Sequence, residues 1–194
     1  AIDSGTFIIS SSDDAIHSNG AVVINGGKFD LSSGDEAINA GTSLEINGGT
    51  INVSKSSDGL KGVNVAINDA LVEIDSGDDG ITANDILTFV GADVTVNSVG
   101  DGIKSDNDED STKGLISIED CAVTVVSSQG DAITAQTQLM IISGTFTLTS
   151  GDGSAGIPSS TVSTKGLKAG SSIVVDDGVF VISSSDDTIN SNNI

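Results

Sequence analysis

A repeat of about 21 to 22 residues runs along the whole chain and constrains its fold more than any other feature. Sliding the segment Gly27–Asn39 along the sequence aligns eight copies, each with four apolar positions at fixed spacing. Such a period is typical of solenoid proteins, in which a single repeat cannot bury its apolar face alone and stacks on its neighbours.

Two of the apolar positions illustrate the pattern. The first is filled by Phe7, Phe29, Ile51, Val72, Val94, Val123, Phe146 and Phe180, and the last by Ile16, Ile38, Leu60, Ile81, Ile103, Ile133, Leu167 and Ile189. Within a repeat, apolar and polar residues alternate, as in Lys28–Ser32, which predicts short strands with one buried face. Gly, Asn and Asp mark the turns between these strands.

We therefore predict an all-β fold, a right-handed single-stranded parallel β-helix of about eight coils with three short strands each. Two loop insertions lengthen the repeat, at about residues 105–113 and 149–164. Residues 1–194 are expected to form a single domain. Because neither end of the sequence shows a polar cap or a covering helix, we expect a fragment of a longer protein, or coils that stack end to end on neighbouring β-helix coils.

The net charge of the chain limits the classes of partner that it can bind. Its 28 acidic residues face 7 lysines and no arginine, which gives a formal net charge of −21. This charge argues against nucleic acid and against an anionic membrane surface as partners. No apolar run approaches the roughly 18 residues of a membrane span, so membrane insertion is not expected. So many hard oxygen ligands favour Ca²⁺ as a bound ion.

An acidic residue stands just before the last apolar position in nearly every repeat, and the residue before it is often acidic too. In stacked strands these carboxylates would lie about one strand spacing apart, where like charges repel by roughly 1 kcal/mol in water. The predicted calcium ligands along this edge are Asp13, Asp14, Asp35, Glu36, Asp58, Asp78, Asp79, Asp101, Asp131, Asp186 and Asp187. The alternative is that each Asp only forms a turn by bonding local N–H groups.

The first insertion contains a second candidate calcium site. Asp106, Asp108 and Asp110 alternate as in a calcium-binding loop, although the Gly and the closing Glu of an EF-hand are missing. Asp101 of the same repeat can add another oxygen. The alternative is a solvated acidic loop.

Lysines recur three residues beyond the acidic position, at Lys61, Lys104 and Lys168. One interpretation is that these lysines, together with Ca²⁺, bind anionic groups of a ligand. The other is that they balance charge on a strand surface. His17 occupies the same position and is expected to be a surface residue. The single Cys121 stands where other repeats have Gly or Ala, so it is expected to fill a tight corner rather than to act as a reactive thiol.

No catalytic residue is predicted. The chain has no histidine beyond His17 for a nucleophilic triad, and the acidic pairs repeat too often to single out one glycosidase pair. A polysaccharide lyase, which eliminates across a uronate with Ca²⁺ and a basic residue such as Lys, remains an alternative.

Several segments resemble a known family. They are Ser11–Gly20, Gly100–Asp120 and Ser163–Asn192, with the most specific likeness at Asp13–Asn19, Lys165–Gly170 and Asp186–Asn192. The chain is similar, over nearly its whole length, to a bacterial carbohydrate-binding domain family built as a polysaccharide-lyase-like right-handed parallel β-helix. The resemblance implies secretion or display on the cell surface, bound Ca²⁺, and binding of plant-type polysaccharide or acidic sugars without established turnover.

The composition bears on how a sugar can be bound. Sugar sites usually offer an aromatic platform, but this chain has no Trp or Tyr, and its 5 Phe occupy apolar positions of the repeat. We therefore predict an extracellular or cell-surface calcium-binding carbohydrate-binding module that holds acidic, uronate-containing polysaccharide by polar contacts. The alternatives are a structural or adhesive β-helix segment of a surface protein or filament without glycan binding, and the lyase.

Overall fold

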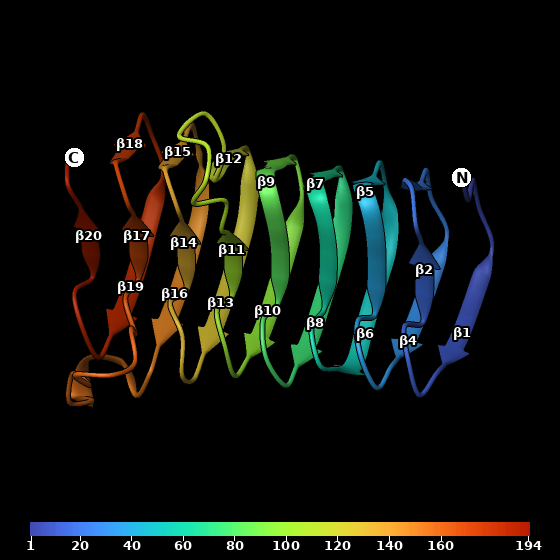
Figure 1. The fold of residues 1–194 in the computed structure, drawn as a ribbon, viewed down its shortest axis with the longest axis horizontal. Coiled ribbons are helices and arrows are strands. Elements are labelled where there is room, and N and C mark those ends of the chain that lie inside the picture. Colours follow the sequence, from blue (N-terminus) through green and yellow to red (C-terminus); the bar gives the residue numbers. More distant parts are fainter.

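The computed structural model describes residues 1–194, and its regular secondary structure is almost entirely β-strand (Figure 1). Its 20 strands form two sheets, of eight and twelve strands, whose strand pairs are parallel. The one helical segment is a single 3₁₀ turn, η1, at Gly153–Ala155. The predicted all-β, parallel architecture is confirmed, and the two stacked sheets are consistent with a parallel β-helix or solenoid. No helix in the structure has the length and apolar character needed to cross a membrane.

The eight-stranded sheet takes one strand from each repeat. Its strands follow one another in chain order as β1 (Thr6–Ser10), β4 (Lys28–Ser32), β6 (Gly49–Ser56), β8 (Ala70–Ser76), β10 (Asp93–Ser98), β13 (Cys121–Ser127), β16 (Gly144–Ser150) and β19 (Val179–Ser184). The register places Phe7 opposite Phe29 at one end and Phe146 opposite Phe180 at the other. The first apolar column predicted from the sequence is confirmed along the whole sheet.

The twelve-stranded sheet contains the rest of each repeat. Its strands are β2 (Ile16–Ser18), β3 (Val22–Ile24), β5 (Ile38–Ile46), β7 (Leu60–Asn68), β9 (Ile81–Val90), β11 (Ile103–Ser105), β12 (Leu115–Glu119), β14 (Ile133–Ala135), β15 (Gln138–Ile141), β17 (Leu167–Ala169), β18 (Ser172–Val175) and β20 (Ile189–Ser191). The last apolar column aligns in register from Ile16 opposite Ile38 to Leu167 opposite Ile189.

The prediction of three short strands in every repeat is wrong for β5, β7 and β9. Each of these strands is continuous, so two predicted strands merge into one. The bend between the two halves is absorbed by register shifts between Ala40 and Ser43 and between Gly62 and Asn64, which keep the ladder on both sides. Elsewhere a turn or a loop separates the halves.

Small residues form the corner before the eight-stranded sheet. Gly144 has a φ of 139°, and a Cβ added to it would lie 2.5 Å from the carbonyl oxygen of Cys121. Where Cys121 itself is the corner residue, the positive φ moves to the preceding Asp120, at 58°. The thiol of Cys121 is buried and donates to the carbonyl oxygen of Glu119 at 3.1 Å, and burial raises its pKa. The prediction that Cys121 fills a corner is thus supported.

All five phenylalanines belong to the core or pack against it. Phe29, Phe89 and Phe146 are fully buried, and Phe7 and Phe180 cover the ends of the first apolar column. The rings of Phe7 and Phe29 stack with centroids 4.8 Å apart, as do those of Phe146 and Phe180. No aromatic side chain is left to form a flat platform on the outer surface.

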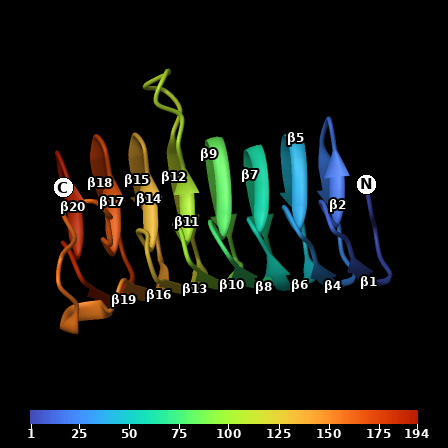
Figure 2. The ribbon, with the colours of Figure 1, turned by 60° about the horizontal axis from the view of Figure 1, so that its bottom comes forward.

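Both insertions fall between strands. The first connects β11 with β12 and projects beyond the edge of the sheet (Figure 2). The second connects β16 with β17 and includes η1. Its backbone is tied to the last repeat, because the N–H groups of Asp152 and Ser154 donate to the hydroxyls of Ser185 and Ser183, each at 2.9 Å.

Candidate functional site

The predicted acidic edge lies in the turns that lead from the eight-stranded into the twelve-stranded sheet. Along it, a carboxylate oxygen accepts the main-chain N–H at the matching position of the next repeat. These bonds run from Glu36 to Asp14, from Asp79 to Asp58, from Asp101 to Asp79, from Asp131 to Asp101 and from Lys165 to Asp131, with lengths of 2.7 to 3.1 Å. The carboxylates therefore stabilise the stacked turns, as the turn-forming alternative requires.

The three lysines predicted to bind ligand contact this acidic edge. The closest pairs are Lys61 with Glu36 at 2.5 Å, Lys104 with Asp79 at 3.1 Å and Lys168 with Asp131 at 2.8 Å. Asp131 is 1% exposed, so its ion pair with Lys168 compensates a buried charge. These contacts match the charge-balancing alternative, and a role of the three lysines in ligand binding stays a prediction.

Burial changes the acidity of two carboxyls of the edge, Asp101 and Glu36. It raises the pKa of Asp101, and the charges of Asp131 and Asp79 add to that shift. Burial also raises the pKa of Glu36, although the hydrogen bond from Lys61 opposes the change. The stacked carboxylates thus carry a cost of burial and mutual repulsion where no lysine fully offsets it.

We expect Asp101→Asn to raise the free energy of unfolding at about pH 7 by roughly 1 kcal/mol, because like charges one strand spacing apart repel by about that much in water. The amide oxygen can still accept the N–H of Asp131, a bond of 2.8 Å in the wild type. Since the folded pKa of Asp101 is raised, the folded state binds the proton more tightly than the unfolded state. The wild type should therefore gain stability relative to the variant as the pH falls through that pKa toward the ordinary value of 3.8.

Urea denaturation from about pH 7 to about pH 4 measures this difference. Asp93→Asn is the matched control, since Asp93 is exposed on β10 outside the acidic edge and its replacement should leave the free energy of unfolding at about pH 7 nearly unchanged. A variant at Asp101 that is less stable than the wild type at pH 7 would show that the charge itself is needed.

Three carboxylates at the N-terminal end of the edge differ from the others. Ligand oxygens of Asp13, Asp14 and Asp35 lie within 4.8 Å of one another. The carboxylates of Asp13 and Asp35 have no hydrogen-bond or ion-pair partner in the protein, whereas Nδ1 of His17 lies 2.7 Å from Oδ2 of Asp14. Burial opposes ionisation of Asp14, but hydrogen bonds with Glu36 and His17 outweigh it and lower its pKa. Hard carboxylate oxygens at this spacing fit Ca²⁺.

The other predicted calcium ligands of the edge do not form a group of three or more carboxylates as close together as this one. Asp186 pairs with Lys165, and Asp187 accepts a hydrogen bond from Asn190 at 2.9 Å. Burial raises the pKa of Asp78, and neighbouring carboxylates add to the shift. The structure thus brings together three of the predicted calcium ligands and gives most of the others partners within the protein.

The structure does not gather Asp106, Asp108 and Asp110 of the first insertion into one group of ligands. Oδ1 of Asp110 accepts the N–H and the hydroxyl of Thr112, at 2.9 and 2.7 Å. The loop is tied down by Asp85 of β9, whose Oδ2 lies 2.9 Å from Nζ of Lys113. Sequence reasoning missed Asp85, because it stands outside the acidic position of the repeat.

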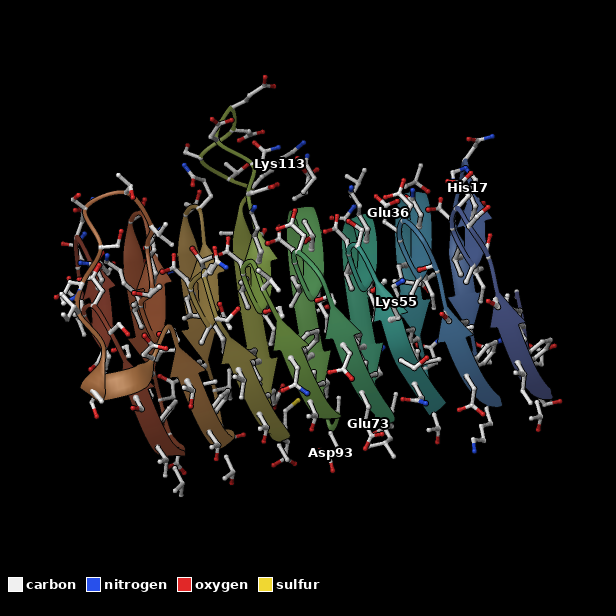
Figure 3. The ribbon with its side chains drawn as sticks, turned by 90° about the horizontal axis from the view of Figure 1, so that it is seen from below. His17, Glu36, Lys55, Glu73, Asp93 and Lys113 are labelled. Carbon is white, nitrogen blue, oxygen red and sulfur yellow. The ribbon has the colours of Figure 1, made fainter.

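A groove of about 370 Å³ lies beside the acidic edge, where the strands of the eight-stranded sheet end. Its walls are Ser54–Ser56 of β6, Asp75–Gly77 at the end of β8, Asn97–Val99 at the end of β10 and Val126 of β13. In the view of Figure 3, Lys55 is labelled below Glu36 and above Glu73. Lys55 was not singled out from the sequence, and it is the one lysine without a carboxylate oxygen within 4.0 Å.

A β-bulge places Lys55 in this groove. The register between β6 and β8 shifts between Val53 and Ser56, so that Ser54 and Lys55 occupy the space of Asp75 alone in the next repeat. The repeat keeps its overall length because the turn that follows is one residue shorter. Because the length of the repeat is unchanged, hydrophobic periodicity does not detect the bulge.

Comparison with known proteins identifies one family. A family model described as "Carbohydrate-binding domain-containing protein" matches residues 1–37 and 60–194. The matched ranges leave out residues 38–59, which include the bulge and Lys55. Searches of curated proteins and of solved structures found no match. Because the family match covers most of the sequence, the chain belongs to the family of carbohydrate-binding domain-containing proteins.

Proposed function

We propose that this chain is a non-catalytic, calcium-dependent carbohydrate-binding domain that holds acidic, uronate-containing polysaccharide outside the cell or on its surface. Family membership supports the carbohydrate ligand. The observation that carries the calcium dependence is the group of Asp13, Asp14 and Asp35, whose oxygens converge without a lysine among them. The proposal takes the fold to be one right-handed, polysaccharide-lyase-like β-helix of about eight coils.

Calcium would solve the electrostatic problem of an acidic protein that binds an acidic polymer. Ca²⁺ takes about 6–8 oxygen ligands, so the three aspartates leave coordination positions for oxygens of a ligand. The ion supplies positive charge at an edge that otherwise repels carboxylates. Asp13, Asp14 and Asp35 hold it, and the hydrogen bond from the N–H of Glu36 orients Asp14 at 3.1 Å.

Polar side chains rather than aromatic rings are available to contact the sugar. A second groove of about 170 Å³ adjoins the first on the outer face of the eight-stranded sheet, and Asn52, Glu73 and Thr95 line it. Amide, carboxylate and hydroxyl groups of this kind can donate to and accept from sugar hydroxyls. This surface supports recognition by hydrogen bonds, in keeping with the burial of every Phe.

A lyase activity has less support. Elimination needs a base that is neutral at the working pH, and Lys61 and Lys104 are the lysines nearest the acidic edge's centre. The hydrogen bond with Glu36 raises the pKa of Lys61, and Asp79 raises that of Lys104 although burial opposes the shift. Both amines are thereby held in the protonated form, which cannot accept a proton.

One observation favours the structural or adhesive candidate. The edge strands β1 and β19 expose large apolar side chains, with Ile8 at 83%, Val179 at 62% and Val181 at 61%. Stacking on neighbouring β-helix coils would cover these side chains and pair the open strand edges.

Retention on immobilised polygalacturonate tests the proposal. We expect retention with Ca²⁺ and loss of retention when a chelator such as EGTA is added, because the ion then leaves the acidic edge. Methyl-esterified polygalacturonate is the matched neutral ligand and should retain the chain more weakly. Retention that is unaffected by EGTA contradicts the calcium dependence. No retention on either polymer contradicts carbohydrate binding and favours the structural candidate, and release of unsaturated uronate, seen as ultraviolet absorbance, would show a lyase.

A further inference from the structure

We infer that the groove beside the β-bulge is a subsite for one anionic sugar residue, in which Lys55 and Ser56 hold the carboxylate and Asp75 and Asn97 hold hydroxyl groups. The inference rests on the proposed function and adds to it a second point of contact, separate from the calcium group. The volume of the groove, about 370 Å³, lies within the range of about 300–1,000 Å³ that is usual for ligand pockets.

The charge of Lys55 is the first argument. The other six lysines each have a carboxylate oxygen within 4.0 Å, so their charges are locally compensated. Lys55 is exposed and has no such partner. On a chain with a formal charge of −21, this ammonium group is the one side chain that can give an incoming anion an uncompensated, charge-assisted hydrogen bond.

The hydroxyl of Ser56 is the second, independent argument. Ser56 is 5% exposed, and its Oγ has no hydrogen-bond partner in the protein although it lines the groove. The serines at the matching position of the next two repeats, Ser76 and Ser98, donate to the carbonyl two residues further on, at 3.4 and 3.1 Å. The shortened turn after Ser56 removes this acceptor. A buried hydroxyl without a partner costs about 1–3 kcal/mol, which a ligand oxygen can recover.

The opposite wall of the groove offers mainly acceptors. Nδ2 of Asn97 donates to Oδ1 of Asp75 at 3.0 Å, which leaves Oδ2 of Asp75 and the amide oxygen of Asn97 to accept sugar hydroxyls. The charge of Asp75 repels a carboxylate from this wall. A uronate therefore fits in one orientation, with its carboxylate toward Lys55 and its hydroxyls toward Asp75.

The groove lies on the same edge as the calcium group. The N–H of Ser57 donates to the carbonyl oxygen of Asp35 at 2.9 Å, and the N–H of Ser33 donates to that of Lys55 at 2.9 Å. The repeats that carry Asp35 and Lys55 are therefore adjacent, about 4.8 Å apart. A polymer that runs along the edge can contact both sites at once. Lys55 also lies in the segment that the family match leaves out.

Calorimetric titration of the whole chain with tetragalacturonate, in the presence of Ca²⁺, tests the subsite. We expect Lys55→Ala to weaken binding by about tenfold or more, as the loss of a charge-assisted hydrogen bond does. Lys28→Ala is the matched control, because Lys28 lies in the same sheet but already pairs with Asp30 at 3.7 Å. Ser56→Ala should weaken binding several-fold while the melting temperature stays equal or rises, since it removes an unpaired buried hydroxyl.

Binding by the wild type distinguishes a failure of the subsite from a failure of the proposed function. If the wild type binds tetragalacturonate and Lys55→Ala binds it equally well, the subsite is overturned while the proposed function stands. The same conclusion follows if Ser56→Ala keeps full affinity and Lys28→Ala weakens binding as much as Lys55→Ala. If the wild type binds neither tetragalacturonate nor polygalacturonate, the proposed function itself fails, and the subsite with it.

Discussion

Replacing Phe29 with alanine is expected to lower the free energy of unfolding by about 3–5 kcal/mol, the usual cost of removing a buried phenyl ring. Phe29 is fully buried and lies in the first apolar column between Phe7 and Ile51. The column cannot close over the cavity, because the hydrogen-bond ladder on either side fixes the spacing of the strands. Urea denaturation followed by circular dichroism measures the loss.

Phe7→Ala is the matched control for this prediction. The two rings stack with centroids 4.8 Å apart, but Phe7 lies on the edge strand β1 and is only partly buried. Its replacement should cost roughly half as much or less, because less apolar area leaves the core. Equal losses at both positions would mean that the interior of the rod does not differ from its end, and would contradict the stacked core.

The double replacement of Asp13 and Asp35 by asparagine is expected to abolish calcium-dependent retention on polygalacturonate, with at least a tenfold loss of calcium affinity. Two of the three converging carboxylates would then be neutral, and affinity for Ca²⁺ depends strongly on ligand charge. Folding should be preserved, since neither carboxylate has a partner in the protein. Calcium titration by calorimetry measures the affinity of both proteins.

Asp108→Asn combined with Asp110→Asn is the matched control, because it neutralises two aspartates of the competing candidate site. The insertion offers no converged group of carboxylates, so this variant should bind Ca²⁺ and polygalacturonate as the wild type does. If instead the insertion variant loses calcium and the Asp13 and Asp35 variant keeps it, the calcium site lies in the loop and the assignment to the first two repeats is wrong.

The all-β fold with parallel sheets was largely predictable, because the sequence repeats the same pattern of apolar positions eight times. The apolar column of Phe7 and its counterparts aligns in the structure as the spacing predicted. The merging of two predicted strands into one was not predictable. The strand β7 continues past Gly62 because its register with the neighbouring strand β9 shifts there, and local sequence does not reveal such a shift. The handedness and the number of coils stay predictions.

The candidate site was less predictable than the fold. The acidic position was found, but the sequence could not show that the N–H of the next repeat occupies one oxygen of Asp79 or that Lys168 compensates the buried Asp131. These contacts depend on the neighbouring repeat with which each side chain pairs, and the sequence alone does not specify that repeat. Lys55 and Ser56 were missed for a related reason, because a bulge that leaves the repeat length unchanged is invisible to a periodicity argument.

A crystal structure of the protein with Ca²⁺ and tetragalacturonate tests most directly whether this acidic edge binds uronates through calcium. The predicted result is an ion about 2.3–2.6 Å from oxygens of Asp13, Asp14 and Asp35, with a uronate carboxylate against Lys55 one repeat away. No ion at the three aspartates in saturating Ca²⁺, or an oligosaccharide bound on another face of the rod, would contradict it.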